Sequence, residues 1–123
     1  MGIKTDVTRR FILLETGEEM SEVRTINEGG KAVQVREPFT LRLAMIRSLI
    51  SPLDSDKSES SEKKLDRYLL AKRVKENDFV DLSNEEIKTI KDRIAQGWPG
   101  AGVSGQAAEM LDISIAESKK KKD

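Results

Sequence analysis

The feature that most constrains the fold is an apolar segment, LRLAMIRSLI, at residues 41–50, which lies between Pro38 and Pro52. Pro38 disfavours a helical conformation at the residue before it, Pro52 ends a helix, and Thr40 can cap a helix that follows it. At 100° per residue, the apolar side chains cover most of the circumference of this helix. The helix therefore needs neighbours on several sides, and we expect it to be either the centre of the core or half of an oligomer contact.

The residues before this helix have the pattern of strands separated by turns. Thr16-Gly17 and the run from Asn27 to Gly30 are the separators, and glycine and asparagine tolerate the positive φ that tight turns require. Alternation is clearest near the end, where Val33 and Val35 share one face. A three-stranded antiparallel meander over residues 7–36 is the simplest arrangement that these signals predict.

Three more helices are predicted after Pro52, at residues 62–76, 84–96 and 105–116. Ser83 and Glu86 form a Ser-x-x-Glu capping box at the start of the second of them. The segment before the first, residues 52–61, is rich in serine and acidic residues and poor in apolar ones. We therefore expect this segment to be a mobile, solvated loop.

The spacing of apolar residues assigns faces to these helices. In the helix at 62–76, Leu65, Tyr68 and Leu69 form one stripe, and Leu70 and Val74 lie nearly opposite. The other two helices have one inward face each, formed by Ile87, Ile90 and Ile94 in one and by Ala107, Ala108, Leu111 and Ile115 in the other. The helix at 84–96 is therefore expected to lie on the surface of the core.

Together these signals predict an α+β fold in a single domain, residues 1–116, in which an N-terminal antiparallel β-meander precedes about four α-helices, the first at 40–51. A chain of 123 residues is long enough to bury one modest core. Residues 117–123 include a run of lysines and have nothing to bury, so we expect a disordered tail. No apolar stretch has the length of a signal peptide or a membrane span, and no membrane association is expected.

The composition removes most catalytic chemistry. The chain has no cysteine and no histidine, and therefore lacks thiolate nucleophiles, the common zinc ligands, the Ser-His-Asp triad and the usual general base near neutral pH. Lysine plus arginine and aspartate plus glutamate number 22 each, so the net charge gives no general attraction to nucleic acid or anionic membrane. We expect a protein that is not an enzyme and binds no cofactor or metal.

The sequence GAGVSG at residues 100–105 has the Gly-x-Gly-x-x-Gly pattern of a phosphate-binding loop, but its context differs. In a dinucleotide-binding fold, a strand precedes this loop and a second strand with an acidic residue follows it. Here a predicted helix precedes the pattern, and only 18 residues follow Gly105. We therefore predict a corner between two helices, in which Gly97 stops one helix and Ser104 caps the next.

Trp98 and Pro99 lie in this corner, and Trp98 is the only tryptophan. A large aromatic side chain in such a place either plugs the edge of the core or anchors a partner. Trp98 and Pro99 are therefore candidate partner contacts. The exposed edge of the meander is a second candidate, because a free edge can pair with another strand.

One local charge asymmetry indicates a different function. The segment 63–75 is basic, and its candidate contacts to nucleic acid are Lys63, Lys64, Arg67, Lys72 and Arg73. Basic helices bind phosphate groups, although these cations surround the helix instead of forming one stripe, and their stems can cover apolar surface. A nucleic-acid-binding regulator is therefore the alternative to a protein-interaction module.

The C-terminal half carries one further pattern, which consists of Glu85-Glu86-Ile87, Ile90-Lys91, Gly97-Trp98-Pro99, Val103-Ser104-Gly105-Gln106-Ala107 and Leu111. This pattern resembles small bacteriophage and prophage proteins of about this size that have no assigned function. The resemblance implies a phage-encoded protein made in the cytoplasm of a bacterial host, and it supplies no site residues. Small phage proteins without catalytic chemistry commonly bind phage or host proteins, or self-associate, as assembly factors, virion components or modulators of host machinery.

Overall fold

The structure, a computed structural model, describes residues 2–98 and 100–121. In chain order its elements are β1 (Ile3–Asp6), β2 (Ser21–Glu28), β3 (Lys31–Pro38), α1 (Leu41–Ile50), the 3-10 helix η1 (Asp54–Ser58), α2 (Ser61–Glu76), β4 (Phe79–Leu82), α3 (Asn84–Gly97) and α4 (Ala101–Lys121). The predicted α+β fold is confirmed. The helices predicted at 40–51, 62–76 and 84–96 correspond to α1, α2 and α3 to within one residue at each end.

Side-chain caps fix the starts of three helices. The Thr40 hydroxyl accepts a hydrogen bond from a first-turn amide of α1 (3.3 Å), and the Ser60 hydroxyl does the same for α2 (3.3 Å). At α3 the predicted capping box is confirmed. The Ser83 hydroxyl accepts from the Glu86 N–H (3.1 Å), and the Glu86 carboxylate accepts from the Ser83 N–H (2.9 Å). Each cap satisfies backbone donors that have no partner within their own helix.

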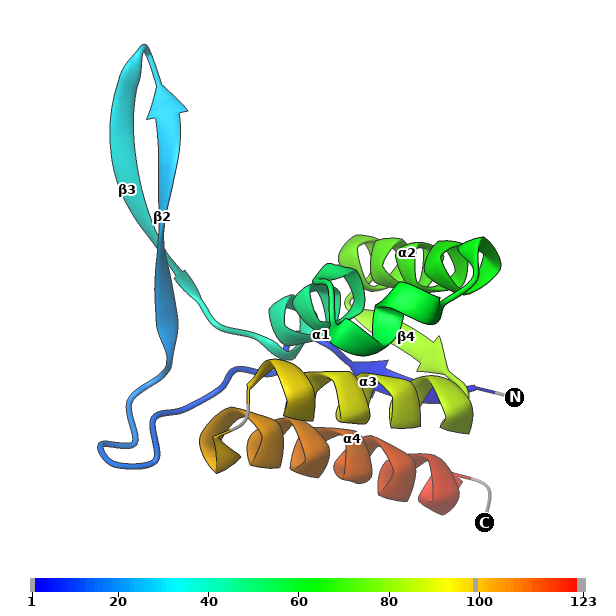
Figure 1. Cartoon of the computed structure of the whole chain (residues 1–123). Coiled ribbons are helices and arrows are strands. Elements are labelled where there is room, and N and C mark those ends of the chain that lie inside the picture. Colours follow the sequence, from blue (N-terminus) through cyan, green and yellow to red (C-terminus); the bar gives the residue numbers. More distant parts are fainter. Residues whose placement is uncertain (1, 99, 122–123) are drawn as a thin grey trace.

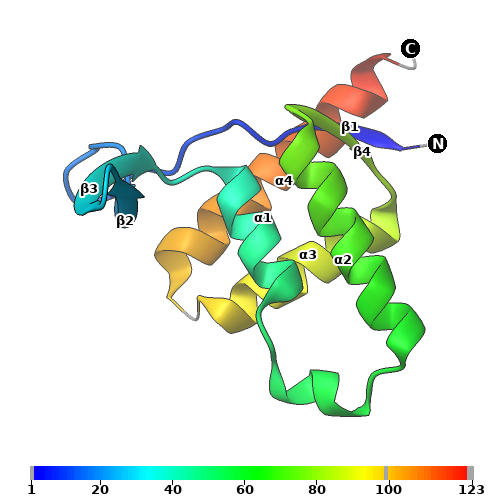
Figure 2. The same ribbon diagram turned by 90° about the horizontal axis from the view of Figure 1, so that it is seen from above.

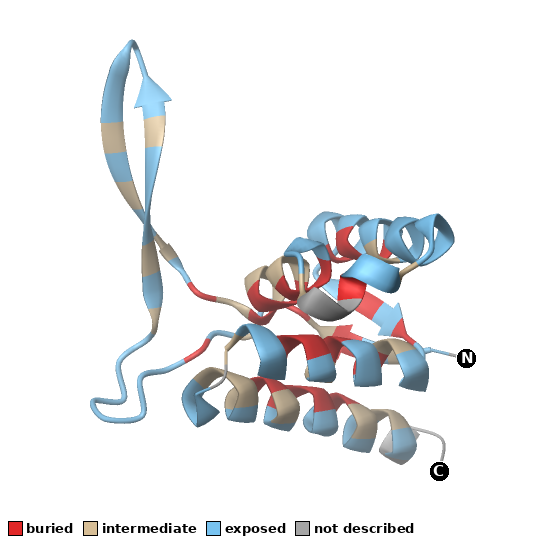
Figure 3. Ribbon diagram, viewed as in Figure 1, coloured by how far each residue is buried: buried red, intermediate tan, exposed pale blue. Residues whose placement is uncertain are grey.

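Helix α1 is the centre of the core, as one of the two interpretations of segment 41–50 predicted. It packs against α2, α3 and α4. Figure 3 shows the buried residues gathered where the helices meet. On α1 the buried apolar side chains are Leu41, Ala44, Met45 and Leu49. Ile87, Ile90 and Ile94 of α3 and Ala107 and Leu111 of α4 complete this part of the core, on the faces that their spacing predicted.

The described strands form two separate two-stranded antiparallel sheets, so the predicted three-stranded meander is wrong in its pairing. β1 pairs with β4, a strand that the sequence analysis did not identify. Residues 7–16 form no regular strand. Val7 and Phe11 within them are fully buried, and the Phe11 N–H donates to the Phe39 carbonyl (2.9 Å). The segment runs along the core as an irregular connection because these buried side chains fix its path.

Strands β2 and β3 form a hairpin that projects from the helices (Figure 1). Residues 21–38 are hereafter the arm. Eight residue pairs join its strands, and Gly29 and Gly30 form the turn at its tip with φ of 60° and 81°. Positive φ at both turn positions is the type I′ geometry, which matches the twist of paired strands and confirms the predicted turn. At about 3.4 Å per residue, eight residues give an arm about 27 Å long.

Helix α4 begins earlier than the sequence predicted. The prediction was a helix over 105–116, whereas α4 begins at Ala101, so most of the glycine-rich corner is helical. Positive φ among the described glycines occurs only before residue 31, so no glycine in GAGVSG has the positive φ that makes glycine necessary in tight turns. Ser104 is therefore not a cap, and its hydroxyl donates to the Gly100 carbonyl one turn earlier (3.1 Å). Val103 favours the early start because it packs against the core.

The predicted disorder of the lysine-rich tail is wrong for residues 117–121, which continue α4. Glu117 forms an ion pair with Arg9 (3.5 Å), and Ile115 packs against the core. Positive charge near the C-terminus of a helix interacts favourably with the helix dipole. Lys119 is therefore compatible with a longer helix, and residues 122 and 123 lie outside the described residues.

Replacement of Gly105 by alanine is expected to stabilise the protein. Gly105 is exposed inside α4, and an added Cβ would meet no neighbouring atom within 4 Å. Alanine is favoured over glycine in a helix interior by about 0.5–1 kcal/mol. The free energy of unfolding from urea titration should rise by this amount. A decrease would show that the segment is a corner that needs the freedom of glycine.

The predicted mobile loop at residues 52–61 contains η1 and a buried carboxylate. Asp56 accepts two hydrogen bonds from Arg93 of α3 (2.8 and 3.0 Å), and it also accepts one from the Leu53 N–H (2.9 Å). The prediction of a solvated acidic segment is therefore wrong for Asp56, because a buried ion pair ties this residue to α3. The sequence does not reveal this contact, because nothing in the composition of segment 52–61 distinguishes Asp56 from the other acidic residues.

Candidate functional site

The arm is exposed along its length, but its base is fixed to the core. No residue of β2 or β3 is buried. At the base, backbone hydrogen bonds join Phe11 to Phe39 (2.9 Å), Met20 to Phe11 (2.8 Å) and Phe39 to Met20 (2.9 Å). The rings of Phe11 and Phe39 meet edge to face with centroids 5.0 Å apart, and both are buried. The arm therefore starts from a well-packed point.

Two ion pairs involve residues of the arm. Arg47 of α1 pairs with both carboxylate oxygens of Glu22, with one N–O distance of 2.5 Å. Within the arm, Arg24 pairs across the strands with Glu37 (2.6 Å). Partly exposed pairs of this kind contribute about 1 kcal/mol or less. The Arg47–Glu22 pair joins the base of the arm to α1, whereas the Arg24–Glu37 pair joins the two strands of the arm.

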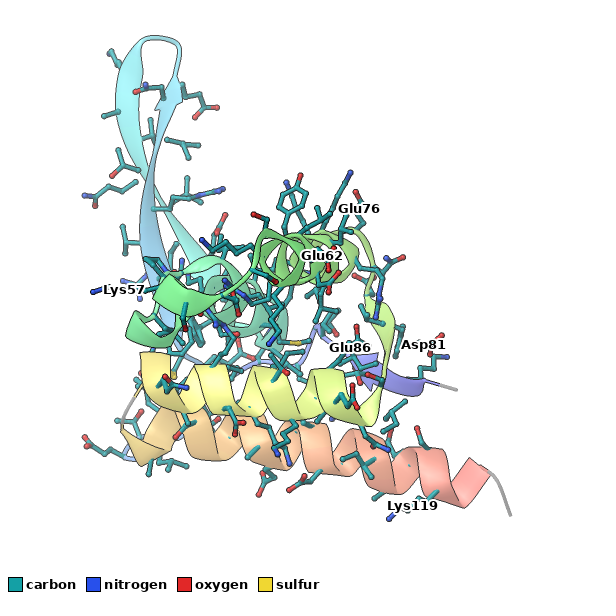
Figure 4. The ribbon with its side chains drawn as sticks, turned by 45° about the vertical axis from the view of Figure 1, so that its right-hand side comes forward. Lys57, Glu62, Glu76, Asp81, Glu86 and Lys119 are labelled. Carbon is teal, nitrogen blue, oxygen red and sulfur yellow. The ribbon has the colours of Figure 1, made fainter. Side chains whose placement is uncertain are left out.

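The register of the arm sorts its side chains into two faces. Ile26, Val33 and Val35 lie on one face, and Val23 lies on the other, where it is 56% exposed. Apart from the contact of Arg47 with Glu22 at the base, no other described helix or strand packs extensively along these faces, and Figure 4 shows the side chains of the upper arm extending into open space. A two-stranded hairpin alone is marginally stable in water. Because no residue of the arm is buried, its apolar side chains remain available to a partner.

Both edges of the arm present unpaired backbone groups. The two-residue turn makes Glu28 and Lys31 a hydrogen-bonded pair, and hydrogen-bonded and non-hydrogen-bonded pairs alternate from there. Thr25 and Gln34 fall in a non-hydrogen-bonded pair, whose N–H and C=O groups point outward. Free edges of this kind can pair with another strand. The arm thus supplies the free edge that the sequence analysis placed on a meander.

An apolar groove of about 540 Å³ lies beside the base of the arm. Its apolar lining consists of Ile12, Leu13, Leu14, Met20, Trp98 and Val103. Gln106 of α4 holds one wall in place, since its side chain accepts a hydrogen bond from the Ile12 N–H (2.9 Å) and donates one to the Ile12 carbonyl (2.7 Å). Met20 directly precedes the arm, so a single partner can touch both the groove and the arm.

Trp98 belongs to both the core and the groove. Its ring meets Phe39 edge to face with centroids 5.9 Å apart, which agrees with the predicted role as a plug at the edge of the core. The side chain is only half-buried, and it also lines the groove. Its role as a partner contact stays a prediction. Pro99, the other candidate contact in this corner, lies outside the described residues.

The predicted basic helix is α2, and the structure divides its candidate cations into two groups. Arg67 is 14% exposed, pairs with Glu59 and donates to the Leu49 carbonyl (2.6 Å). Arg73 donates to the Asp81 carbonyl (2.6 Å). The exposed candidates are Lys63, Lys64 and Lys72. Two of the five cations are therefore engaged within the chain, and contact of the other three with nucleic acid stays a prediction.

Arg93, the buried cation of α3, was not among the residues predicted from the sequence. Besides its bonds to Asp56, Arg93 donates to the carbonyls of Ser48 (2.5 Å) and Ser51 (3.0 Å), and the residue is 6% exposed. Its position in the helix was the sequence signal that could have indicated burial. Arg93 lies three residues after Ile90 and therefore on the apolar side of the helix, where a charged side chain needs buried partners.

The same contact gives the protein a pH dependence. The hydrogen bonds from Arg93 hold the pKa of the Asp56 carboxyl well below its usual range. A carboxyl with a lower pKa in the folded state contributes stability above its unfolded pKa of about 4, and the contribution is lost as the pH falls toward the folded pKa. We expect the melting temperature to fall between about pH 5 and pH 2, and to fall less in Asp56→Asn. Thermal unfolding followed by circular dichroism checks this, and equal acid sensitivity would assign the effect to other carboxyls.

No family model, curated protein or solved structure matches the chain. Over residues 2–98 and 100–121, no group of three or more carboxylates is placed to hold a metal ion. No helix in the same ranges is long and apolar enough to cross a membrane. The candidate site therefore rests on geometry: both faces of the arm are uncovered, and an apolar groove lies at its base.

Proposed function

We propose that the protein is a non-catalytic interaction module that binds a protein partner through the arm. The observation that carries this proposal is the exposure of the arm, in which eight residues of each strand are paired and none is buried. A hairpin of this length contributes little to the core of its own chain and is marginally stable alone. Binding to a partner would bury the arm and accounts for its exposure in the single chain.

The proposed partner is a protein with an exposed strand edge. Backbone hydrogen bonds to the free edge of the arm supply affinity, and the side chains of Ile26 and Val33 on one arm face supply specificity. The groove that contains Trp98 offers a second contact to the same partner. The well-packed base of the arm lowers the entropy cost of binding because the strands are already positioned.

The resemblance of the C-terminal half to small phage and prophage proteins suggests where this module acts. In this proposal the protein is phage-encoded and works in the cytoplasm of a bacterial host. There it takes part in virion assembly, is carried in the virion, or alters host machinery by the same contacts. This assignment rests on analogy with small phage proteins.

Proline variants at the edges of the arm test the proposal. A partner is first captured from phage-carrying bacterial cells on the wild-type protein but not on a variant in which Gly-Ser-Gly replaces residues 22–37. The captured protein is then purified. Thr25→Pro and Gln34→Pro each remove one outward N–H without removing a hydrogen bond of the hairpin. The partner is expected to pair with the edge of either β2 or β3. Isothermal titration calorimetry should show at least about a tenfold loss of affinity for the proline variant in the strand that pairs with the partner.

Thr25→Ala and Gln34→Ala are the matched controls, because they change the same side chains and keep both N–H groups. Both should bind with wild-type affinity. Circular dichroism establishes that each variant is folded. Wild-type affinity in both proline variants would contradict pairing through the arm edges.

A further inference from the structure

Helix α2 carries an apolar stripe that its own chain leaves uncovered. Leu65, Tyr68 and Leu69 are 54%, 56% and 50% exposed. The opposite side of the helix, formed by Leu70, Ala71 and Val74, is buried. Both apolar sides are evident from the sequence, and in the structure the core covers the side of Leu70 and Val74. A helix with a second apolar side has a further surface to bury.

Residues along this stripe have the spacing of a coiled coil. Glu62, Leu65, Leu69 and Lys72 follow at intervals of three, four and three residues, as do the a and d positions of a heptad. All four are exposed. Along the helix these residues are acidic, leucine, leucine and basic. In a second helix that runs in the opposite direction, a leucine therefore faces each leucine, and a charge of opposite sign faces each charge. Glu62 and Glu76, both labelled in Figure 4, lie in the first and last turns of α2.

This order makes the stripe complementary to itself in one orientation. In an antiparallel pair of α2 helices, Glu62 meets Lys72 of the second copy and Leu65 meets Leu69 of the second copy, and the two-fold axis repeats both contacts. A parallel pair places Glu62 against Glu62 and Lys72 against Lys72, where like charges repel. Among the described residues, neither Glu62 nor Lys72 takes part in an ion pair.

We propose that the protein forms a two-fold symmetric dimer in which the α2 helices pack antiparallel through this stripe. The 16 residues of α2 span about 24 Å, so the interface is small and the dimer is reversible. Figure 2 shows the arm and α2 on opposite sides of α1, so dimerisation leaves both arms free. The dimer therefore presents two arms to a partner, although the proposal itself does not depend on what the arm binds.

Charge exchange tests the dimer, with mass measured by sedimentation equilibrium over a range of protein concentrations. Glu62→Lys places lysine opposite Lys72 at two points of the dimer, and Lys72→Glu places glutamate opposite Glu62 at two points. Each variant alone should dimerise at least about tenfold more weakly than the wild type. An equimolar mixture of the two variants restores both contacts, as does the variant with both changes. Both should dimerise within about threefold of the wild-type affinity.

Lys64→Glu is the matched control, since it makes the same change of charge on α2 outside the stripe. It should dimerise like the wild type, and circular dichroism should show unchanged folding in all variants. A wild-type protein that stays monomeric up to about 1 mM would overturn the proposal. Wild-type dimerisation of both single-exchange variants would overturn it as well, because a parallel pair or another surface would then hold the dimer.

Discussion

Arg93→Ala should lower the free energy of unfolding by about 3–5 kcal/mol, as expected when one partner of a buried ion pair is removed. Asp56 would keep a buried carboxylate without its two hydrogen bonds from Arg93. The carbonyls of Ser48 and Ser51 would lose donors at the same time. Buried polar groups left without partners carry a desolvation cost that exceeds the net value of the bonds themselves. Urea unfolding at pH 7, followed by circular dichroism, measures the change.

Arg24→Ala is the matched comparison, because Arg24 also pairs with a carboxylate, Glu37, but on the exposed arm. It should cost about 1 kcal/mol or less. The double variant Asp56→Ala with Arg93→Ala should cost less than the sum of the two single changes, since it leaves no unpaired charge. A cost of about 1 kcal/mol or less for Arg93→Ala would show that this pair does not hold segment 52–61 to α3.

Phe39→Ala should have an effect of similar size, about 3–5 kcal/mol. Phe39 is 3% exposed and lies between the rings of Phe11 and Trp98, with centroid distances of 5.0 and 5.9 Å. Truncation leaves a cavity and removes two aromatic contacts at the point where the arm joins the core. Trp98 fluorescence should also shift to longer wavelength because the ring loses a neighbour and gains contact with water. Urea titration followed by this signal measures both effects.

Phe79→Ala provides the control for this prediction. Phe79 is 55% exposed on β4, and the contact described for its ring is the Lys4 ammonium 4.8 Å from the centroid. Its truncation should cost about 1 kcal/mol or less. Equal costs at the two positions would mean that Phe39 is not a core residue, and that the base of the arm is less firmly held than its contacts indicate.

The helices and the hairpin turn are predictable from the sequence because their signals are local. Thr40 and the Ser83–Glu86 capping box mark helix starts, and the structure has a helix at each. Gly29-Gly30 specifies a turn that needs positive φ at two successive positions. The apolar coverage of segment 41–50 predicts a helix that is surrounded, because it has few polar positions, but it leaves open whether the core or an oligomer contact surrounds it.

The remaining features depend on contacts between distant residues, which local patterns do not encode. β1 and β4 pair across most of the chain, and each strand is only four residues long. Asp56 and Arg93 are 37 residues apart, and nothing in the acidic segment distinguishes Asp56 from its neighbours. The glycines of GAGVSG suggest a corner by their type alone, whereas packing of Val103 against the core favours a helix there.

The most direct test of the account is the affinity of the arm-deleted variant, with Gly-Ser-Gly in place of residues 22–37, for the captured partner. Because no residue of β2 or β3 is buried, this variant should melt within about 5 °C of the wild type, which shows that the body is intact. Isothermal titration calorimetry should then show binding weakened at least about a hundredfold. Wild-type affinity in the folded, arm-deleted protein would contradict the central claim that the arm is the binding element.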